Sequence, residues 1–252
     1  MRSPMDISAV VLTKNESSVL GRCLKKLQFC SEILVIDDYS TDTTRLVART
    51  FGATVYKRHL GNNFAAQRNF ALTKAKNAWV LFVDADEIVN TNLRKEIQYA
   101  VTSDTIVGYY IPRKDVFLGK QLNHGEFGKT QLLRLGKRQE GKWVRPVHEK
   151  WEIMGPTLSL KEPLFHYSHD SLSQFITQTS FHAELHAKQR HHEVGDISLL
   201  RVLLYPAGKF LFNFLYLRGF QDGTRGFVAA VMMSFHSFLA WSTVILHYDK
   251  KH

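Results

Sequence analysis

The sequence predicts an α/β fold with a mostly parallel sheet sandwiched by helices. Two observations support this prediction. Short apolar runs rich in branched residues alternate with stretches whose apolar residues recur at helical spacing over residues 7–83. The apolar runs are continuous, which is typical of strands that are buried on both faces. A parallel sheet covered by helices on both sides satisfies both observations.

The individual elements of this half follow from local signals. Strands are expected at residues 7–12, 32–38, 53–58 and 78–83. Helices are expected over residues 19–27, from the segment "YSTDTT" to about Phe51, and over 64–75. The Ser, Thr and Asp side chains of "YSTDTT" can cap the second helix, and Gly52 ends it.

The pattern changes after residue 105. Strand-like segments are expected at residues 106–113, 130–135, 142–153 and 162–167, and a long helix over 171–192. From residue 198 the chain is dense in large apolar and aromatic residues, in two stretches at 199–220 and 227–248. We therefore divide the chain into a main domain over residues 1–170, with halves at about 5–105 and 106–170, and a helical extension over 171–252.

The composition restricts the class of partner. The chain has 252 residues and a net charge of +10, which favours anionic partners. It lacks the basic platform interleaved with aromatic residues that is typical of nucleic-acid binders, so no nucleic acid is expected. Cys23 and Cys30 form neither a disulfide framework nor a zinc pattern, and the short apolar stretch 7–12 does not resemble a signal peptide. A cytosolic catalytic part is expected.

Polar clusters follow three of the predicted strands: "TKNE", "DDYSTD" and "DADE". Ligands of parallel sheets bind at the carboxyl ends of strands, so these clusters should converge on one crevice. Asp84, Asp86 and Glu87 crowd together in "DADE", and like charges so close need a positive partner. A hard divalent cation such as Mg²⁺ or Mn²⁺ would relieve all three. The dinucleotide-binding glycine motif and the Walker motif are both absent.

Four blocks in this order carry a resemblance: "VVLTKNE", "ILVIDDYSTDTT", "AAQRNFAL" and "WVLFVDADE". Together they resemble the nucleotide-diphospho-sugar domain of family 2 glycosyltransferases. The later "WVRPVHE", "LFHYSH" and "LRGFQDGTRGF" resemble bacterial enzymes that glucosylate the lipopolysaccharide inner core. The resemblance implies a GT-A fold, a divalent metal, a nucleotide-sugar donor and inversion at the anomeric carbon. A UDP-glucose donor and a lipid-linked saccharide acceptor follow from the sub-family.

The resemblance also implies roles for individual residues. Those assigned to the nucleotide-sugar are Leu12, Thr13, Glu16, Asp38, Arg68, Asp84 and Ala85. Asp38 would read the base edge, Arg68 the nucleotide and Asp84 the ribose, and Asp86 would hold the metal. The family has proline and an aromatic residue near the positions where this chain has Leu12 and Lys14. This departure leaves the base contacts of the first loop open.

The pair His148-Glu149 is the candidate catalytic element of the second half. Inverting transfer needs a base that deprotonates the acceptor hydroxyl, and a carboxylate opposite the leaving group suits this role. Glu149 is our candidate base, and His148 could ligate the metal or bind the diphosphate. The alternative is a strand in which Glu149 points inward and His148 outward, although an unpaired inward carboxylate is costly. Arg134 and Arg145 are further candidates for phosphate contacts.

The tail allows three interpretations. Residues 227–248 contain no Lys, Arg, Asp or Glu, which permits a membrane span by length. The cationic residues among the aromatics of 199–220 instead favour helices that lie in an anionic membrane interface. Soluble packing or a dimer seam is the third interpretation. We expect a peripheral enzyme on the cytoplasmic face of the inner membrane. The apolar contacts expected are Phe210, Phe212, Phe214, Phe235, Phe238 and Trp241, and the cationic contacts Lys209, Arg218, Arg225, Lys250 and Lys251.

Two rival functions remain open. One is transfer to a polyprenyl phosphate, whose acceptor oxygen is already ionised and needs no base. The other is a non-catalytic module that binds anionic lipid and has kept the fold. The histidines of the predicted long helix, His182, His186, His191 and His192, are read as a solvated face because no carboxylate completes a metal motif there.

Overall fold

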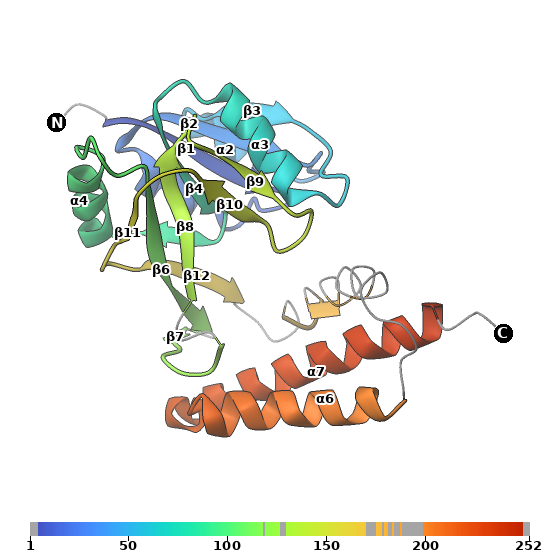
Figure 1. Ribbon diagram of the computed structural model, residues 1–252. Coiled ribbons are helices and arrows are strands. Elements are labelled where there is room, and N and C mark those ends of the chain that lie inside the picture. Colours follow the sequence, from blue (N-terminus) through green and yellow to red (C-terminus); the bar gives the residue numbers. More distant parts are fainter. Residues whose placement is uncertain are drawn as a thin grey trace. The chain divides into compact units, whose positions relative to one another are not determined.

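The computed structural model describes residues 5–117, 119–126, 130–169, 175–177, 179–180, 183, 187 and 199–248. The chain divides into two compact units, which we describe separately (Figure 1). The first comprises residues 1–113 and 131–167, and the second residues 114–130 and 168–252. Residues 114–130 thus group with the C-terminal helices, which their position in the chain does not predict.

The N-terminal half of the first unit is the parallel sheet that the sequence predicts. Strands β1 (Met5–Thr13), β2 (Cys30–Asp37), β3 (Thr54–Lys57) and β4 (Trp79–Asp84) lie in the order β3-β2-β1-β4 and are all parallel. The connecting helices are α1 (Leu20–Leu27), α2 (Thr44–Thr50) and α3 (Phe64–Lys74).

Both faces of this sheet are buried. Ile7 and Val11 of β1 belong to one apolar cluster, whereas Val10 between them belongs to another on the opposite face. Leu20 and Leu24, one turn apart on α1, are fully buried in the first cluster. The continuous apolar runs of the sequence are explained by this burial on two sides.

The second half of the first unit extends and covers the sheet. Strand β8 (Thr130–Lys137) lies antiparallel beside β4, followed by β6 (Gly108–Phe117), β12 (Leu164–His169) and β5 (Glu87–Val89). Strand β11 (Thr157–Ser159) pairs with β6, and helix α4 (Thr91–Ala100) follows β5. Asn90 caps α4 by accepting the Leu93 N–H, as its sequence position predicts.

A small hairpin covers one face of β4. Strands β9 (Gly141–Val144) and β10 (Lys150–Ile153) form a separate antiparallel pair. Trp143 and Trp151 stack across this pair, and both meet the ring of Phe82 edge-on. The interpretation of residues 142–153 as one strand is wrong, because residues 145–149 form a loop between two strands. This loop carries the candidate base.

The second unit contains a helical hairpin. Strand β7 (Lys120–Gln121) pairs with the end of β6, and helix α6 (Leu199–Leu211) continues into a π-helical turn, η2 (Phe212–Tyr216). A 3₁₀ turn, η3 (Gly219–Asp222), leads into the long helix α7 (Gly223–Tyr248). Helices α6 and α7 lie side by side (Figure 1). Residues Gly219–Leu246 are long and apolar enough to cross a membrane by length and composition.

Several predictions for the tail fall outside the described residues. These are most of the helix expected over 171–192, its histidines His182, His186, His191 and His192, and the cationic residues Lys250 and Lys251.

Candidate active site

The candidate site lies where β1, β2 and β4 end side by side in the first unit. The parallel register places Thr13 opposite Asp37 and Leu12 opposite Asp84. The polar clusters that follow these strands therefore meet at one edge of the sheet, as predicted for the carboxyl ends of parallel strands.

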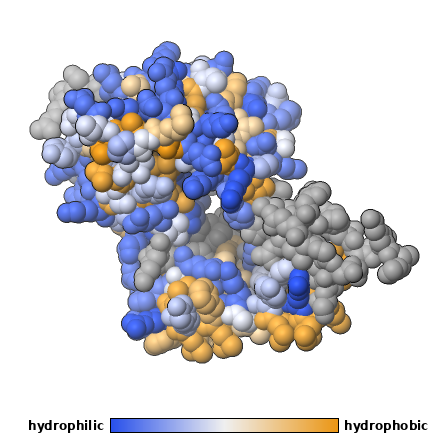
Figure 2. All heavy atoms as spheres, in the orientation of Figure 1, coloured by the Kyte–Doolittle hydropathy of each residue, from blue (hydrophilic) through white to orange (hydrophobic). Residues whose placement is uncertain are grey.

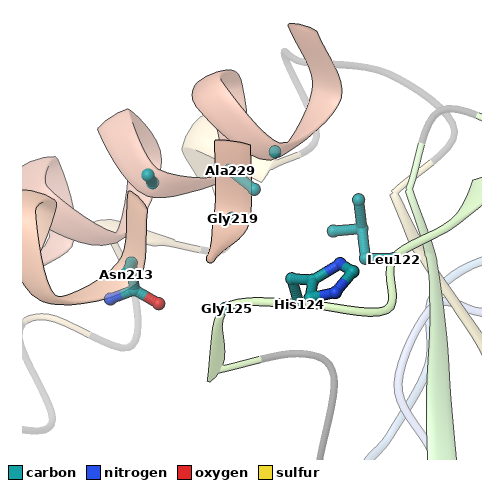
Figure 3. A pocket seen from close by; sticks show the side chains of 8 residues that line it. Leu122, His124, Gly125, Asn213, Gly219 and Ala229 are labelled. Atoms are coloured by element: carbon teal, nitrogen blue, oxygen red, sulfur yellow. The ribbon is translucent and has the colours of Figure 1, made fainter. Parts of the chain in front are cut away.

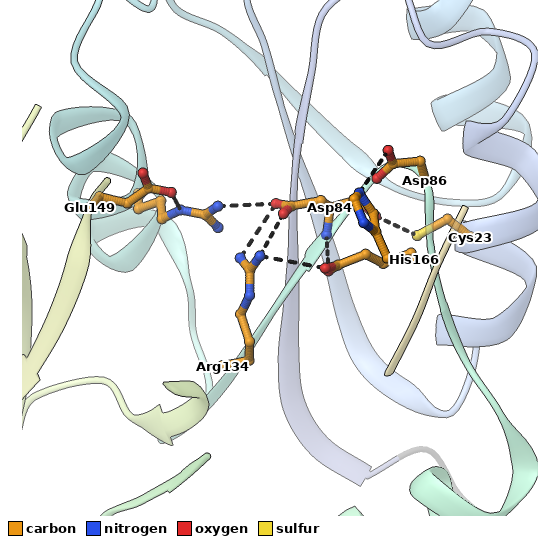
Figure 4. A network of polar contacts seen from close by, with 8 residues as sticks. Cys23, Asp84, Asp86, Arg134, Glu149 and His166 are labelled. Carbon is orange, nitrogen blue, oxygen red and sulfur yellow. Dashed lines mark hydrogen bonds and ion pairs between the residues drawn. The ribbon is translucent and has the colours of Figure 1, made fainter. Parts of the chain in front are cut away.

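Asp84, whose side chain is 31% exposed, is the centre of an ionic network built on two buried arginines (Figure 4). Its Oδ1 lies 3.0 Å from Nη2 of Arg68, and its Oδ2 lies 2.5 Å from Nη2 of Arg134. Only 4% and 6% of these two arginine side chains are exposed. Burial opposes ionisation of Asp84, but the charges of Arg134 and Arg68 hold its pKa well below the usual range. Two arginines thus compensate this carboxylate.

Glu87 stabilises the turn of "DADE" with its buried side chain. Its side chain is fully buried, and its Oε2 accepts the backbone N–H of Asp84 at 2.8 Å. Its Oε1 lies 3.6 Å from Nη2 of Arg134. Burial raises the pKa of Glu87, and the Arg134 charge opposes this rise. The expectation that a cation relieves all three carboxylates is corrected here, because arginines within the chain pair with Asp84 and Glu87.

Glu149 joins the same network from the loop between β9 and β10. Its Oε1 accepts a hydrogen bond from Nε of Arg68 at 2.9 Å, and its Oε2 accepts none from the described residues. Arg68 therefore bridges Glu149 and Asp84 (Figure 4). The loop is fixed by Pro146, whose carbonyl accepts the Phe64 N–H at the start of α3.

The backbone of this loop is unusual. Arg145 and His148 have φ angles of 68° and 53°, a region that side-chain-bearing residues seldom adopt. Such conformations persist where the surrounding structure holds them, and they cluster at functional sites. Both residues are exposed. The loop presents Glu149 inward and His148 outward.

Asp86 is paired with a histidine that the sequence interpretation did not assign. Its Oδ2 lies 3.2 Å from Nε2 of His166 on β12, and both side chains are partly exposed. The Tyr167 N–H is donated to the Asp86 carbonyl, which fixes the turn, and Ala85 is buried between the two acids. No cluster of three or more metal-ligating side chains occurs in the described part of the chain. A carboxylate and an imidazole nevertheless suit Mn²⁺, since such cations take their remaining ligands from phosphate and water.

Glu16 faces the acidic side of the site. Burial, and then the charges of Asp86, Asp42 and Asp84, raise its pKa to about 7. Among the neighbouring acids, Asp84 pairs with two arginines and Asp86 lies beside His166. Asp42 has no ion pair among the described residues, but its carboxylate accepts hydrogen bonds from Ser17 and Thr44. The Glu16 carboxylate accepts no hydrogen bond from the described residues. Added positive charge would therefore be stabilised more beside Glu16 than beside the other acids of the crevice.

The loop after β2 holds Asp38 at the surface of the crevice. Its carboxylate accepts hydrogen bonds from Nζ of Lys14 at 2.8 Å and from the Leu60 N–H at 3.0 Å. Burial opposes ionisation, but these hydrogen bonds lower the pKa of Asp38. The neighbouring Tyr39 ring stacks on His59 with centroids 3.8 Å apart. Lys14, where the family departure was noted, therefore contacts the acid assigned to the base.

Asp37 has a structural role. It is fully buried, accepts the Ser40 N–H at 3.0 Å and lies 3.5 Å from the Thr13 hydroxyl. Asp42 accepts the Thr44 N–H in the turn before α2, whereas the N-cap residue, Thr43, makes no side-chain cap hydrogen bond.

The structure thus gathers most of the predicted residues and adds two. Leu12, Thr13, Glu16, Asp84, Ala85 and Asp86 lie at the ends of β1 and β4 or in the turns that follow. Arg68 and Glu149 join Asp84, and Asp38 lies in the neighbouring loop. His166 and the Asp84-binding role of Arg134 were missed. The signals were a histidine within "LFHYSH" and an arginine within the apolar run "LLRL", where a charge needs a buried partner.

Comparisons with known proteins agree with this geometry. Residues 8–152 match the family described as glycosyl transferase family 2. An uncharacterized glycosyltransferase of Rickettsia prowazekii, RP128, is 29% identical over 92% of this chain and 84% of its own length. The lipopolysaccharide core biosynthesis glycosyltransferase LpsC of Rhizobium meliloti is 26% identical over 93% of this chain and 90% of its own length.

Among solved structures, a mannosyltransferase from Pyrobaculum calidifontis, in complex with GDP-Man and Mn²⁺, has the same fold. The TM-score is 0.53 and the identity 14%, over 99% of this chain and 89% of the other. The chain is a glycosyltransferase with a GT-A fold. It belongs to glycosyl transferase family 2.

Proposed function

We propose that this glycosyltransferase moves a sugar, with inversion, from a nucleotide-sugar onto a hydroxyl group of a lipid-linked saccharide such as the lipopolysaccharide core. UDP-glucose is the proposed donor. The similarity to LpsC over nearly the whole chain supports the core saccharide as acceptor. The resemblance of "WVRPVHE" and "LRGFQDGTRGF" to inner-core glucosyltransferases supports glucose.

One observation carries the proposal: Arg68 joins a donor-side acid, Asp84, to a candidate base, Glu149, in one buried network. A fold that only bound lipid would have no reason to bury these charges together, because each buried charge is costly unless it is paired. The Oε2 of Glu149, which accepts no hydrogen bond from the residues that the structure describes, favours an acceptor that brings a proton, hence a hydroxyl group rather than a polyprenyl phosphate.

The donor would occupy the carboxyl ends of β1, β2 and β4. We propose that Asp38 accepts a base N–H, with Leu12, Thr13 and Glu16 beside the base, and that Asp84 and Ala85 meet the ribose. Lys14 lies next to Asp38 and is available to a base carbonyl. Uracil presents such an N–H between two carbonyls, which agrees with a UDP-sugar.

The chemical step can be written with these residues. Glu149 accepts the proton of the acceptor hydroxyl as its oxygen attacks the anomeric carbon from the face opposite the diphosphate. The new carbon–oxygen bond forms, the bond to the diphosphate oxygen breaks, and the nucleoside diphosphate leaves with that electron pair. Arg68 holds Glu149 in place by its hydrogen bond at 2.9 Å. Preorganised groups of this kind supply much of a typical rate enhancement.

A divalent cation, Mg²⁺ or Mn²⁺, is proposed as cofactor, with Asp86 as ligand and His166 beside it. When bound, it would neutralise the charge that develops on the leaving diphosphate. His148, on the exposed side of the Glu149 loop, is proposed as a further metal or diphosphate contact. The acceptor would place the enzyme at the cytoplasmic face of the inner membrane, on an anionic surface, as a peripheral protein.

The test is a panel of nucleotide-sugars, scored by release of the nucleoside diphosphate with Mn²⁺ and with EDTA. We expect release from UDP-glucose that depends on Mn²⁺, and loss of metal-dependent UDP binding in calorimetry for Asp86→Ala. Asp104→Ala, the same substitution at an exposed position after α4, is the matched control and should bind as the parent does. Equal UDP affinity in Mn²⁺ and EDTA would refute the metal proposal, and no release from any donor would refute the activity.

A further inference from the structure

The outward face of the α6–α7 hairpin is apolar and carries no charge. On α6 and η2, exposed side chains recur at helical spacing: Leu200, Leu203, Leu204, Leu211, Leu215 and Tyr216. A second series on α7 comprises Phe227, Val231, Phe235, Phe238 and Leu246. Figure 2 shows apolar side chains along the edge where Figure 1 places α6. A helix face in water normally carries charge, so this apolar stripe is expected to be covered.

Two of the predicted membrane contacts, Trp241 and Lys209, need correction. Lys209 pairs with Glu126. Trp241 is buried, not exposed: only 4% of it is accessible, and its ring lies against Tyr205 with centroids 4.8 Å apart. Phe210 and Phe214 are half-buried and pack on Phe227. The leucines of α6 form the exposed surface, and these were not singled out from the sequence.

The opposite side of the hairpin is polar and is fastened to residues 123–126. The Asp222 carboxylate accepts the backbone N–H groups of Asn123 and His124 at 3.0 and 2.9 Å, and lies 3.1 Å from Nδ1 of His124. Asn213, which is buried, accepts the Glu126 N–H at 3.0 Å. His124 faces the hairpin (Figure 3), and the cavity that it lines there has a volume of only about 10 Å³. We call these contacts the polar clamp.

An ion pair between Lys209 and Glu126 completes the polar clamp. At about 100° per residue, Lys209 and Asn213 lie on the side of the helix opposite Leu204 and Leu211. The motif "LRGFQDGTRGF" explains the tight turn of the clamp. A Cβ on Gly226 would come within 1.9 Å of the Gly219 carbonyl oxygen, so no larger residue fits.

The polar clamp argues against a transmembrane hairpin. If α7 crossed a bilayer, α6 would cross beside it, because the two helices pack along each other. Yet the helical residues 199–216 of α6 and η2 include Arg201 and Lys209, and they end at the clamp. Charges in hydrocarbon are costly, which disfavours a span for this helix. The hairpin therefore fits a surface that is apolar on one side and aqueous on the other.

We propose that the hairpin lies in the plane of an anionic membrane interface, with the apolar stripe in the acyl boundary and the polar clamp toward water. The charges of the hairpin identify this partner. Between Leu199 and Tyr248 the sole acid, Asp222, is held in the clamp. Arg218 and Arg225 are exposed, and each lies two residues before an exposed phenylalanine in the sequence. Cations flanked by aromatic residues suit an interface rich in phosphate. The inference rests on the proposed function in so far as a lipid-linked acceptor requires a bilayer.

The experiment is flotation of the full chain with vesicles of phosphatidylcholine, and of equal parts phosphatidylcholine and phosphatidylglycerol. We expect the parent to float with both and more strongly with the second. Leu204→Glu/Leu211→Glu should abolish flotation with both. The matched control, Tyr99→Glu/Leu158→Glu, adds the same charge at exposed apolar positions of the first unit and should float as the parent does. Metal-dependent donor hydrolysis should survive in both variants, which separates this inference from the catalytic proposal.

Two further measurements complete the test. Arg218→Gln/Arg225→Gln should weaken binding to the anionic vesicles about fivefold per arginine and leave binding to phosphatidylcholine unchanged. Alkaline carbonate should release the parent from membranes. Retention after carbonate would show a span and overturn the in-plane hairpin. The proposed lipid surface would be wrong if the parent failed to float. It would also be wrong if the parent were a dimer that Leu204→Glu/Leu211→Glu made monomeric without changing flotation.

Discussion

The candidate site of the first unit and the helical hairpin of the second depart from ordinary burial in opposite ways. Around Asp84, the side chains of Arg68, Arg134 and Glu87 are buried, and each arginine pairs with a carboxylate. On α6, large apolar side chains are exposed over several turns. Folding alone favours neither arrangement, since buried charge and exposed apolar surface both cost free energy. The comparison agrees with the two proposals made above, that a charged ligand binds at the first region and that a lipid surface contacts the second.

The largest effect is expected at the buried network. Glu149→Gln keeps the size and the hydrogen bond to Arg68 but removes the basicity, so turnover should fall by about 10²–10⁴ with little change in donor binding. Single-turnover transfer to an acceptor saccharide, together with calorimetry of donor binding, measures the two separately. Glu152→Gln, on the adjacent strand β10 and exposed, is the control. A Gln variant that transfers at the parent rate would make Glu149 a structural residue.

The next largest effect is expected at Arg134, and it tests whether the charges around Asp84 stabilise one another. Arg134→Met leaves Asp84 with one arginine and Glu87 with none, and breaking a buried pair in this way costs about 3–5 kcal/mol of unfolding free energy. Urea unfolding measures it. Lys137→Met on the same strand removes a cation that is only half-buried and should cost under about 1 kcal/mol.

A second substitution separates the charge effect from lost packing. Glu87→Gln in the Arg134→Met background removes one of the unpaired charges and should recover part of the loss. Glu87→Gln could instead lower the unfolding free energy by the same amount in the Arg134→Met background as in the parent. The two residues would then act independently, and the network interpretation would be wrong.

The two regions also differ in how far the sequence could predict them. The parallel strands and the meeting of "TKNE", "DDYSTD" and "DADE" follow from local patterns, because apolar runs mark strands and their carboxyl ends meet at one edge. Arg134 and His166 come from β8 and β12, which join the sheet by pairing between distant segments. Local periodicity contains no information on such pairing, so neither residue could be placed beside Asp84 or Asp86.

In the hairpin, composition predicted helices but not their outward face. Whether Trp241 or Leu204 is exposed depends on how α6 and α7 pack together, and aromatic content alone favoured the wrong residue. The loop 123–126 was not assigned to the tail, because the contacts of Asp222 span almost a hundred residues.

A smaller effect is expected at the polar clamp. Asp222→Ala removes the acceptor of two backbone N–H groups, and such a loss costs about 1–3 kcal/mol. Hydrogen exchange should show faster exchange at the Asn123 and His124 amides, with no change at the Asp84 amide. Gln221→Ala, exposed in the same turn, should leave all three unchanged. Unchanged protection at Asn123 and His124 would mean that the loop does not depend on the hairpin.

The smallest effect concerns Glu16, the acid of the crevice whose charge is least compensated. Its pKa rises from 4.5 to about 7 because burial and the charges of Asp86, Asp42 and Asp84 disfavour the ionised form. Between these two values the folded chain therefore holds a proton that the unfolded chain has released. The unfolding free energy must then fall as pH rises through this window, and it levels off above the folded pKa.

Glu16→Gln removes this titration, so the metal-free variant should lose less stability than the parent between pH 4.5 and about 7. Urea unfolding of both proteins across that range measures the difference in slope. Adding Mn²⁺ at the upper end should stabilise the parent more than the variant, because a cation at Asp86 would favour the ionised Glu16. If the unfolding free energies of the two proteins change with pH in parallel, Glu16 has a cationic partner. The charge of Glu16 would then be compensated as that of Asp84 is, and the contrast between the two acids would be wrong.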